Sequence, residues 1–455
     1  MMSHRIAISV PLLLIAANGF SISTRRSAIE RTLAPLVVTT TSIFLPPPSP
    51  PDAIAAAAEA EGGTSSESKS ETTSTPISAS WTAVDGLNTL DSSSGKFVSF
   101  DESAYLAMVN DKSRTPQFEK AIFDRLNSPE YGGPSTQVVL DLGTGPYAYF
   151  ALVAAKAGAG RVYAIEASGP ACISARAAVK KAGYENVITI IEGYSTDATL
   201  PGNLKADFAI AEIVGSIASE EGVLATISDA RERLVNRPDD PASWIPRGVQ
   251  TLAAPASYSL HNLFVPPAFD WTKLEGSPVR FNCRDEGLQL LSDPVVVEDV
   301  RFADMGRGAG TTGTGTGTGA TRKERRRVTF EVDGERVEAN AAKFKEEYVR
   351  GRVPDASTLA ISAAGSVTGI ALWPRLILND DVTINSRHYP DGGHQRSHWQ
   401  TVLPIMSPVP VAVGGGDEIT VDFDFDVPYA LTTPPLYRIT GNVVSSGRGM
   451  MFALN

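Results

Sequence analysis

The sequence predicts an α/β fold in which a domain built on a parallel sheet precedes a barrel-like domain of antiparallel strands. Between about residues 136 and 214, apolar runs with strand character alternate with helical segments, which is typical of a parallel sheet flanked by helices. After about residue 251 the runs become β-branched and partly alternating, with Gly, Pro and Asp between them, which favours antiparallel pairing. We therefore expect the first domain over residues 81–255 and the second over 256–455.

The elements of the first domain follow one another across short connections. A helix is expected over residues 101–126, where apolar residues recur at helical spacing. The expected strands are QVVLDL, RVYAIE, NVITIIEG and ADFAIAEIV, and the expected helices are PYAYFALVAAKAGA and ACISARAAVKKAG. In the second domain the expected strands include RVTFEV, SVTGIALWPRLIL, DVTINS and EITVDFDF.

Two segments are expected to be irregular. Residues 59–80 are rich in Ser, Thr and Glu and almost free of apolar residues, which predicts a disordered linker. A Gly/Thr repeat with a basic tail interrupts the second domain at 305–327 and predicts a flexible, solvated loop.

Composition limits the classes of function. The formal net charge of -11 argues against general nucleic-acid binding, because phosphate contacts need a basic footprint. The two cysteines, Cys172 and Cys283, are too few for a disulfide framework or a cysteine-zinc site and fit a reducing compartment. The five histidines show no HExxH-like spacing, so metal catalysis is not expected.

Residues 1–58 have the features of a targeting presequence. The apolar run 6–17 is short for a bilayer span and suits a signal-peptide core. Phe20 and a basic, hydroxylated stretch without acids follow, which is transit-peptide composition. The arrangement resembles the bipartite presequence of algae with secondary plastids, and implies the plastid stroma and a mature protein without a membrane span. A plain secretory signal is an alternative, and Arg-Arg at 25–26 would also suit a twin-arginine signal to the thylakoid lumen.

A glycine turn predicts a cofactor site. VVLDLGTG ends a strand at Asp141 and opens a helix, and Gly143 and Gly145 allow a sharp turn and close approach to a ligand. Glu166 ends the next strand, where an acid can accept hydrogen bonds from both ribose hydroxyls. The run after the turn lacks the third glycine of a dinucleotide fingerprint, since Ala148 stands there.

The strand with an acid before the turn instead resembles motif I of class I methyltransferases. The resemblance implies a Rossmann-like first domain and S-adenosylmethionine as the cofactor. That family usually has a third glycine where this chain has Tyr147.

Two acids downstream predict which group accepts the methyl group. In AEIVGSIASEEGVL, Glu212 ends a strand and Glu221 follows nine residues later, with Gly215 between them. This spacing closely resembles the double-E loop of protein arginine methyltransferases. The resemblance implies that the two carboxylates bind the guanidinium of an exposed arginine in a substrate protein, which bidentate geometry favours.

Three further stretches resemble the same family, over roughly residues 97–260 and 365–425. Ser397-His398-Trp399 resembles its Thr-His-Trp loop, WIPRGVQTLAAPAS resembles the segment between its domains, and YLAMVNDKSRTPQFEKAI resembles the helix that covers the cofactor in the symmetric-dimethylating branch.

The resemblance assigns roles to several residues. Tyr105 and Arg114 would contact the cofactor, with Arg114 facing its methionine carboxylate, and Thr196 replaces the family's adenine-facing glutamate. The remaining implied roles are catalysis by Glu212, Glu221, His398 and Asp111, with Asp111 pairing with His398, and substrate contact by Met108 and Trp399. The proton lost from the guanidinium would leave through Glu221 or the Asp111–His398 pair.

Several questions stay open at this stage. Met108 and the His-Trp pair favour asymmetric dimethylation, whereas the surrounding helix favours the symmetric product. A homodimer with an arm near residues 261–300 is also implied. The rival functions are methylation of a small plastid metabolite and a silent binding protein that kept the fold, which Tyr147 and Thr196 would favour.

Overall fold

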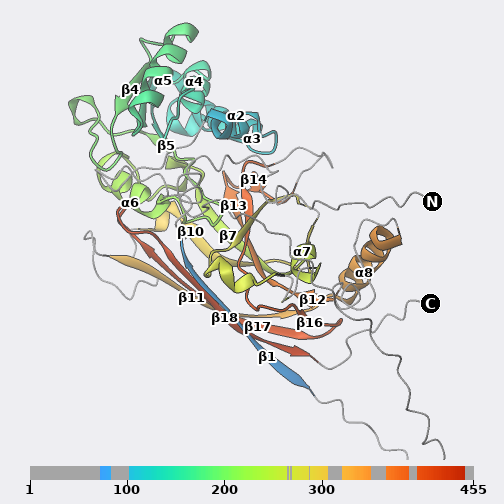
Figure 1. The fold of residues 1–455 in the computed structure, drawn as a ribbon. Helices are drawn as coiled ribbons and strands as arrows, with labels where there is room; N and C mark the ends of the chain where they lie inside the picture. Colours follow the sequence, from blue (N-terminus) through green and yellow to red (C-terminus); the bar gives the residue numbers. More distant parts are fainter. Residues whose placement is uncertain are drawn as a thin grey trace, which may run out of the picture. The chain divides into compact units, whose positions relative to one another are not determined.

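The computed structural model describes residues 72–83, 102–263, 266, 269–285, 287–305, 320–349, 365–388 and 397–445. The expected presequence at 1–58 and the Gly/Thr repeat of the insertion lie outside these residues. The described chain forms a five-stranded parallel sheet with helices and, mostly after it in the chain, antiparallel sheets of seven and four strands, so the predicted fold class is confirmed (Figure 1). No helix in this described part is long and apolar enough to cross a membrane.

The parallel sheet has the strand order β4-β3-β2-β5-β6. The strands are β2 (Val138–Leu142), β3 (Arg161–Glu166), β4 (Ile188–Glu192), β5 (Phe208–Ile210) and β6 (Trp244–Ile245). Because β2 pairs with β3 on one side and with β5 on the other, the strand order reverses beside β2. In open parallel sheets, ligands bind at the carboxyl ends of the strands next to such a reversal.

Helices surround this sheet. They are α2 (Glu102–Asn110), α3 (Thr115–Asn127), α4 (Tyr149–Lys156), α5 (Gly169–Ala182) and α6 (Val223–Arg233), with short 3-10 helices at Pro129–Tyr131, Pro134–Thr136, Pro201–Asn203 and Pro241–Ser243. The single helix expected over 101–126 is therefore two. Asp111 interrupts it because its carboxylate binds the backbone N–H of Ser113, and Pro116 then suits the first turn of α3.

The larger antiparallel sheet has the order β10-β7-β13-β15-β8, with β14 beside β13 and β9 beside β7. Its strands are β7 (Gly248–Tyr258), β8 (Val279–Asn282), β9 (Leu288–Leu290), β10 (Val295–Arg301), β13 (Gly369–Ile377), β14 (Thr383–Asn385) and β15 (Gln400–Leu403). Parallel pairing ends at β6 and antiparallel pairing begins at β7. The change between domains therefore falls between Ile245 and Gly248, whereas the sequence predicts it at residue 255.

The other antiparallel sheet has the order β1-β18-β17-β11. Its strands are β1 (Thr73–Thr82), β11 (Thr321–Glu331), β17 (Glu418–Pro428) and β18 (Leu436–Ser445). The remaining elements are α7 (Ser259–Leu263), α8 (Gly334–Val349), the paired strands β12 (Ser366–Val367) and β16 (Val411–Ala412), and 3-10 helices at Trp271–Leu274 and Phe302–Asp304.

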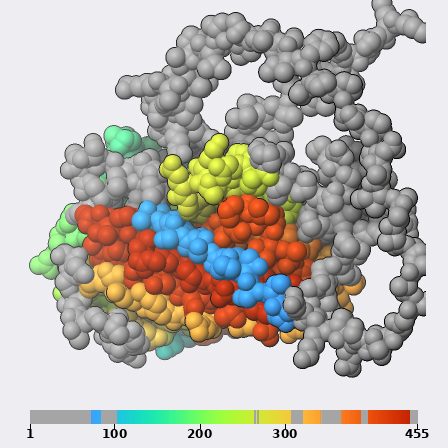
Figure 2. All heavy atoms as spheres, turned by 60° about the horizontal axis from the view of Figure 1, so that its bottom comes forward, coloured from blue at the N-terminus to red at the C-terminus, as the bar shows by residue number. Residues whose placement is uncertain are grey.

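Strand β1 corrects the predicted linker at 59–80 from Thr73 onward; residues 59–71 lie outside the described residues. Residues 73–82 pair along their whole length with β18, and Figure 2 shows this strand in blue against the red strands of the sheet. Ile77 and Trp81 are buried, and the Trp81 ring lies 5.5 Å from that of Tyr437. Thr favours strands, and alternate apolar positions are enough to bury one face of an edge strand. Composition alone concealed this pattern.

Strand β11 corrects the predicted loop at 305–327 in its basic tail, from Thr321 onward. Its basic segment pairs with β17, where Asp422, Asp424 and Asp426 alternate with buried aromatic residues. Arg327 binds Asp422 at 2.7 Å, and Arg325 forms ion pairs with the other two aspartates. The basic tail is thus the last strand of a sheet, because cross-strand carboxylates complement its charge.

Candidate functional site

The glycine turn lies between β2 and α4, at the carboxyl end of the parallel sheet. Gly143 and Gly145 have φ of 72° and 67°, a left-handed backbone that favours glycine. The Asp141 carboxylate accepts hydrogen bonds from Thr144 Oγ1 (2.6 Å) and Ala151 N–H (3.0 Å). Burial raises the pKa of Asp141 to about 6. Asp141, which we expected to contact the cofactor, therefore fixes the shape of the turn.

Glu166 ends β3, and its carboxylate reaches back to the turn. Oε2 accepts the N–H of Gly145 and Oε1 accepts that of Ser168, both at 2.8 Å. Burial raises the pKa of Glu166, and the backbone hydrogen bonds oppose this rise. The two carboxylate oxygens together can accept about four hydrogen bonds, so the group keeps capacity for a ligand hydroxyl.

Two other expected cofactor residues lie around the turn. A Cβ atom at Gly145 would lie 3.3 Å from the Tyr105 ring, so glycine leaves room for this ring. The Thr196 hydroxyl, in the loop after β4, is buried and has no hydrogen-bond partner among the described residues. A buried hydroxyl without a partner costs free energy, so a polar ligand atom at this point would stabilise the loop.

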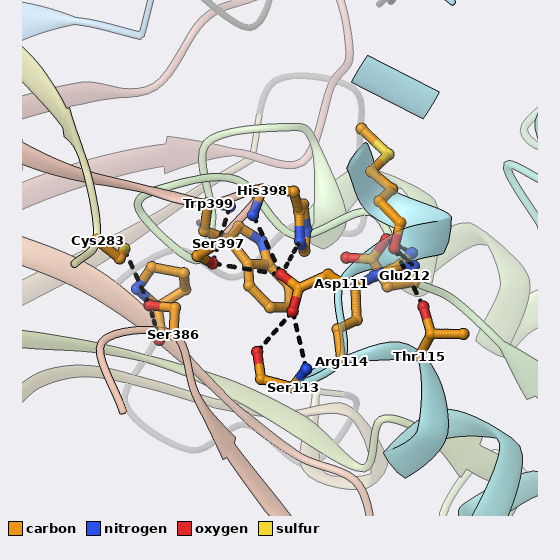
Figure 3. Close-up of polar contacts among 12 residues, drawn as sticks. Asp111, Ser113, Arg114, Thr115, Glu212, Cys283, Ser386, Ser397, His398 and Trp399 are labelled. Carbon is orange, nitrogen blue, oxygen red and sulfur yellow. Dashed lines mark hydrogen bonds and ion pairs between the residues drawn. The ribbon is translucent and has the colours of Figure 1, made fainter. Parts of the chain in front are cut away.

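Asp111 and His398 come together from different domains (Figure 3). Asp111 Oδ2 lies 2.9 Å from His398 Nδ1 and accepts the backbone N–H of the same residue at 3.1 Å. Asp111 Oδ1 accepts hydrogen bonds from the side chain and backbone of Ser113, at 2.6 and 2.9 Å. Burial opposes ionisation of Asp111, but the hydrogen bonds from His398 and Ser113 hold its pKa well below the usual range.

His398 is consequently oriented as a proton acceptor. Burial lowers its pKa, although the hydrogen bond to Asp111 opposes the shift. An ionised Asp111 fixes the Nδ1 proton on the neutral ring, which leaves Nε2 as an acceptor. The pairing that the sequence predicted is present, and its two halves lie on either side of the domain boundary.

Trp399 has a different place from the one expected. Its side chain is buried, its ring centroid lies 3.7 Å from that of His398, and its Nε1–H donates to the carbonyl oxygen of Val214 at 2.8 Å. Trp399 thus supports the backbone that follows Glu212. We had expected substrate contact, but a tryptophan in a β domain is most often buried, and its indole N–H then finds a partner.

Arg114 connects the cofactor side to the acceptor loop (Figure 3). Its guanidinium forms a buried ion pair with Glu212 and donates to the Met108 carbonyl oxygen at 3.0 Å. It also lies over the Phe150 ring, with Cζ 4.9 Å from the ring centroid. Met108 itself is partly buried on α2, and its carbonyl oxygen additionally accepts the hydroxyl of Thr115.

Glu221 is the second acid of the pair. Burial first, and then the charges of Glu212 and Glu220, raise its pKa to about 8, while Arg280 opposes the rise. At neutral pH Glu221 is therefore largely protonated. A cation placed between Glu212 and Glu221 would reverse this, because an opposite charge favours the ionised carboxylate.

Several residues that hold the acceptor loop were not predicted. Glu220 pairs with Arg280 of β8, Ala218 N–H donates to Thr251 Oγ1 at 3.0 Å, and the Ser219 hydroxyl lies 3.1 Å from that of Tyr437. One signal was available: two consecutive acids in a buried loop require a cation nearby. The sequence does not indicate which arginine supplies it.

Comparisons with known proteins find arginine methyltransferases. No protein-family model matches the chain. It is 28% identical over 317 residues to an arginine N(omega)-methyltransferase of Streptomyces achromogenes subsp. streptozoticus, covering 68% of this chain and 73% of that protein. It is 35% identical over 126 residues to protein arginine N-methyltransferase PRMT10 of Arabidopsis thaliana, covering 28% of this chain and 30% of that protein.

A solved structure supports the same fold. The crystal structure of Arabidopsis thaliana protein arginine methyltransferase 10 superposes with a TM-score of 0.50 at 19% identity. The match covers 72% of this chain and 88% of that one, so it includes both domains.

Proposed function

Because the chain belongs to the protein arginine methyltransferase family, we propose that it transfers methyl groups from S-adenosylmethionine to arginine side chains of proteins. The observation that best supports this acceptor is the ion pair of Glu212. Its Oε2 already binds a guanidinium, that of Arg114, in a buried setting. The carboxylate therefore has the surroundings that a substrate arginine requires, and its Oε1 could take a second guanidinium.

The residues around the glycine turn fit the cofactor. Glu166 would accept hydrogen bonds from the ribose, Tyr105 would lie beside the cofactor at Gly145, and Thr196 would use its unpaired hydroxyl on the adenine. Arg114 would bind the methionine carboxylate. When bound, the cofactor supplies a methyl group activated by its sulfonium charge.

The acceptor carboxylates would do the work at the guanidinium. A guanidinium is always protonated at neutral pH and its lone pairs are delocalised, so its nitrogen is a poor nucleophile. Glu212 and Glu221 would fix the group and draw its positive charge toward the bonded nitrogens, which favours attack by the remaining one. The nitrogen that gains a methyl group loses one proton, and Glu221 or His398 Nε2 would accept it.

The experiment that tests this function compares carboxamide variants of the full chain. Glu212→Gln and Glu221→Gln should each reduce methylation of an arginine-rich peptide at least 100-fold, on the scale of losing a preorganised charge. Calorimetry should show that both still bind S-adenosylmethionine. Glu185→Gln, at an exposed acid distant in sequence from the loop, is the matched control and should methylate normally.

Either of two results would refute the proposal. One is wild-type activity in both variants. The other is a chain that methylates a small metabolite but no arginine peptide. The matched relatives are arginine methyltransferases, so neither the small-metabolite function nor the silent binding protein is favoured.

Two further properties are proposed on the sequence alone. Residues 1–60 would direct the protein to the plastid stroma, and a fluorescent fusion in an alga with a secondary plastid should show it there. Phe20→Ala should arrest that fusion earlier on the route, whereas cytosolic fluorescence of the intact leader would contradict the proposal. We also propose a homodimer, which sedimentation of the full chain would test.

A further inference from the structure

The acceptor loop, residues 212–222, is held mainly by the second domain. Trp399 donates to Val214, Gln400 N–H donates to Ser216 Oγ at 3.2 Å, and Arg280 pairs with Glu220. The last two contacts come from neighbouring strands, since β15 pairs with β8 and Val402 stands opposite Arg280. One edge of the antiparallel sheet therefore sets the position of the loop.

Glu220 is held through both of its carboxylate oxygens. Arg280 contacts both its oxygens: Nη2 binds Oε1, and Nη1 lies 3.3 Å from Oε2. Oε2 also accepts the N–H of Ile217 at 3.1 Å. The Glu220 side chain is only 3% exposed and that of Arg280 is 14% exposed. A Cβ atom at Gly215 would lie 2.7 Å from Glu220 Cβ, so glycine there lets this side chain fold back into the loop.

The charges around Glu221 can be counted. Three carboxylates lie together: Glu212, Glu220 and Glu221. Arg114 balances Glu212 and Arg280 balances Glu220, while no ion pair joins a cation to Glu221 among the described residues. Glu221 is therefore the one acid of the three without a cationic partner in these contacts, and a single substrate guanidinium would supply that partner once Glu221 has lost its proton.

We propose that Arg280 is a positioning residue that binds Glu220 and so leaves Glu221 as the one acid available to the incoming guanidinium. This inference rests on the proposed function for the identity of the guanidinium. Without Arg280, two unbalanced acids would stand side by side in a buried loop, and both would favour protonation. Glu220 and Glu221 would then compete for the same position opposite Glu212.

Four variants of the full chain test the proposal: Arg280→Gln, Glu220→Gln, the double variant, and Arg280→Lys. The first readout does not need activity. Glutamate labelled with ¹³C at the carboxyl carbon reports the titration of Glu221 by NMR, and Glu221→Gln identifies its resonance. Glu212, the other charged group that acts on Glu221, and its partner Arg114 remain in every variant.

The expected shifts have opposite signs. Arg280→Gln should move the titration of Glu221 to higher pH, and Glu220→Gln to lower pH, each by roughly one pH unit, the scale for a neighbouring charge. The double variant removes both charges and should titrate near the wild type. Arg280→Lys keeps the charge and should do the same. A contact that only stabilised the fold would lower the melting temperature of all variants without this pattern.

Activity provides the second readout. The pH at which the peptide KM changes should follow the NMR titration in each variant, while the KM for the cofactor stays constant. Unchanged titration of Glu221 in both single variants would overturn the role of Arg280, whatever the activity. If the two single variants show the opposite shifts but the wild-type chain methylates no arginine peptide, the role of Arg280 is supported and the proposed function is rejected.

Discussion

The raised pKa of Glu221 predicts that arginine binding depends on pH. A guanidinium is held by the ionised carboxylate, but at neutral pH most Glu221 side chains carry a proton, since their pKa is about 8. Binding must then expel this proton. Substrate affinity should therefore rise with pH up to about 8 and level off above it.

The change in peptide affinity follows from the difference between the pH and the pKa of Glu221. Each pH unit below it weakens binding about tenfold, or about 1.4 kcal/mol. At pH 6 the peptide should bind roughly 100-fold more weakly than at pH 9, a difference of about 2.7 kcal/mol. The substrate does not contribute, because arginine stays protonated throughout this range. Burial lowers the pKa of His398, which moves its titration away from that of Glu221 toward the acidic end of this range.

The assay is the KM for an arginine peptide between pH 6 and 9, at saturating cofactor. Calorimetry at pH 7 in two buffers of different ionisation enthalpy should show release of nearly one proton for each peptide bound. Glu185→Gln should keep the wild-type profile. A KM that stays constant over this range, with no proton released, would show that Glu221 is already ionised in the free protein and that the reasoning from its burial is wrong.

Three other outcomes follow from the structure. Glu166→Ala should weaken S-adenosylmethionine binding by about 1–3 kcal/mol, the cost of charged hydrogen bonds, and unchanged affinity in calorimetry would remove Glu166 from the site. Deleting residues 1–80 removes nearly all of β1 and should lower stability to urea by roughly 3 kcal/mol or more, whereas deleting 1–70 should not; equal stabilities would contradict the pairing with β18. The wild type should make monomethylarginine with some asymmetric dimethylarginine, and Met108→Phe should shift the product toward the symmetric isomer or stop at one methyl. Mass spectrometry separates the isomers, and a wild-type product that is wholly symmetric dimethylarginine would refute this prediction.

The parts of the site that could be predicted from the sequence are those whose residues lie close together along the chain. The glycine turn, the acid at the end of the next strand and the spacing of Glu212 and Glu221 each lie within one short segment. Strand and turn geometry then fix where their side chains stand. Even so, Asp141 proved to be a support of the turn, because only the structure shows that both its hydrogen bonds are internal.

The parts that were missed depend on contacts between distant segments. The pairing of Arg280 with Glu220 could not be predicted, because the residues around neither of them indicate which distant residue it contacts. The ion pair of Arg114 with Glu212 was missed for the same reason. Strand β1 was missed because its composition resembles that of a linker, and only its partner β18 gives the buried face something to pack against.

The pairing of β1 with β18 has a consequence for how the chain is made. Thr73 stands opposite Ser445, so β1, the first strand of the described residues, can pair only after β18, the last of them, has been synthesised. Contacts between such distant segments form slowly, because a long loop must close before they form. The parallel sheet, whose strands are close in sequence, can assemble earlier. Until β18 has been synthesised, the edge of β17 that later pairs with β18 is exposed. A chaperone could bind this open sheet edge of the nascent chain.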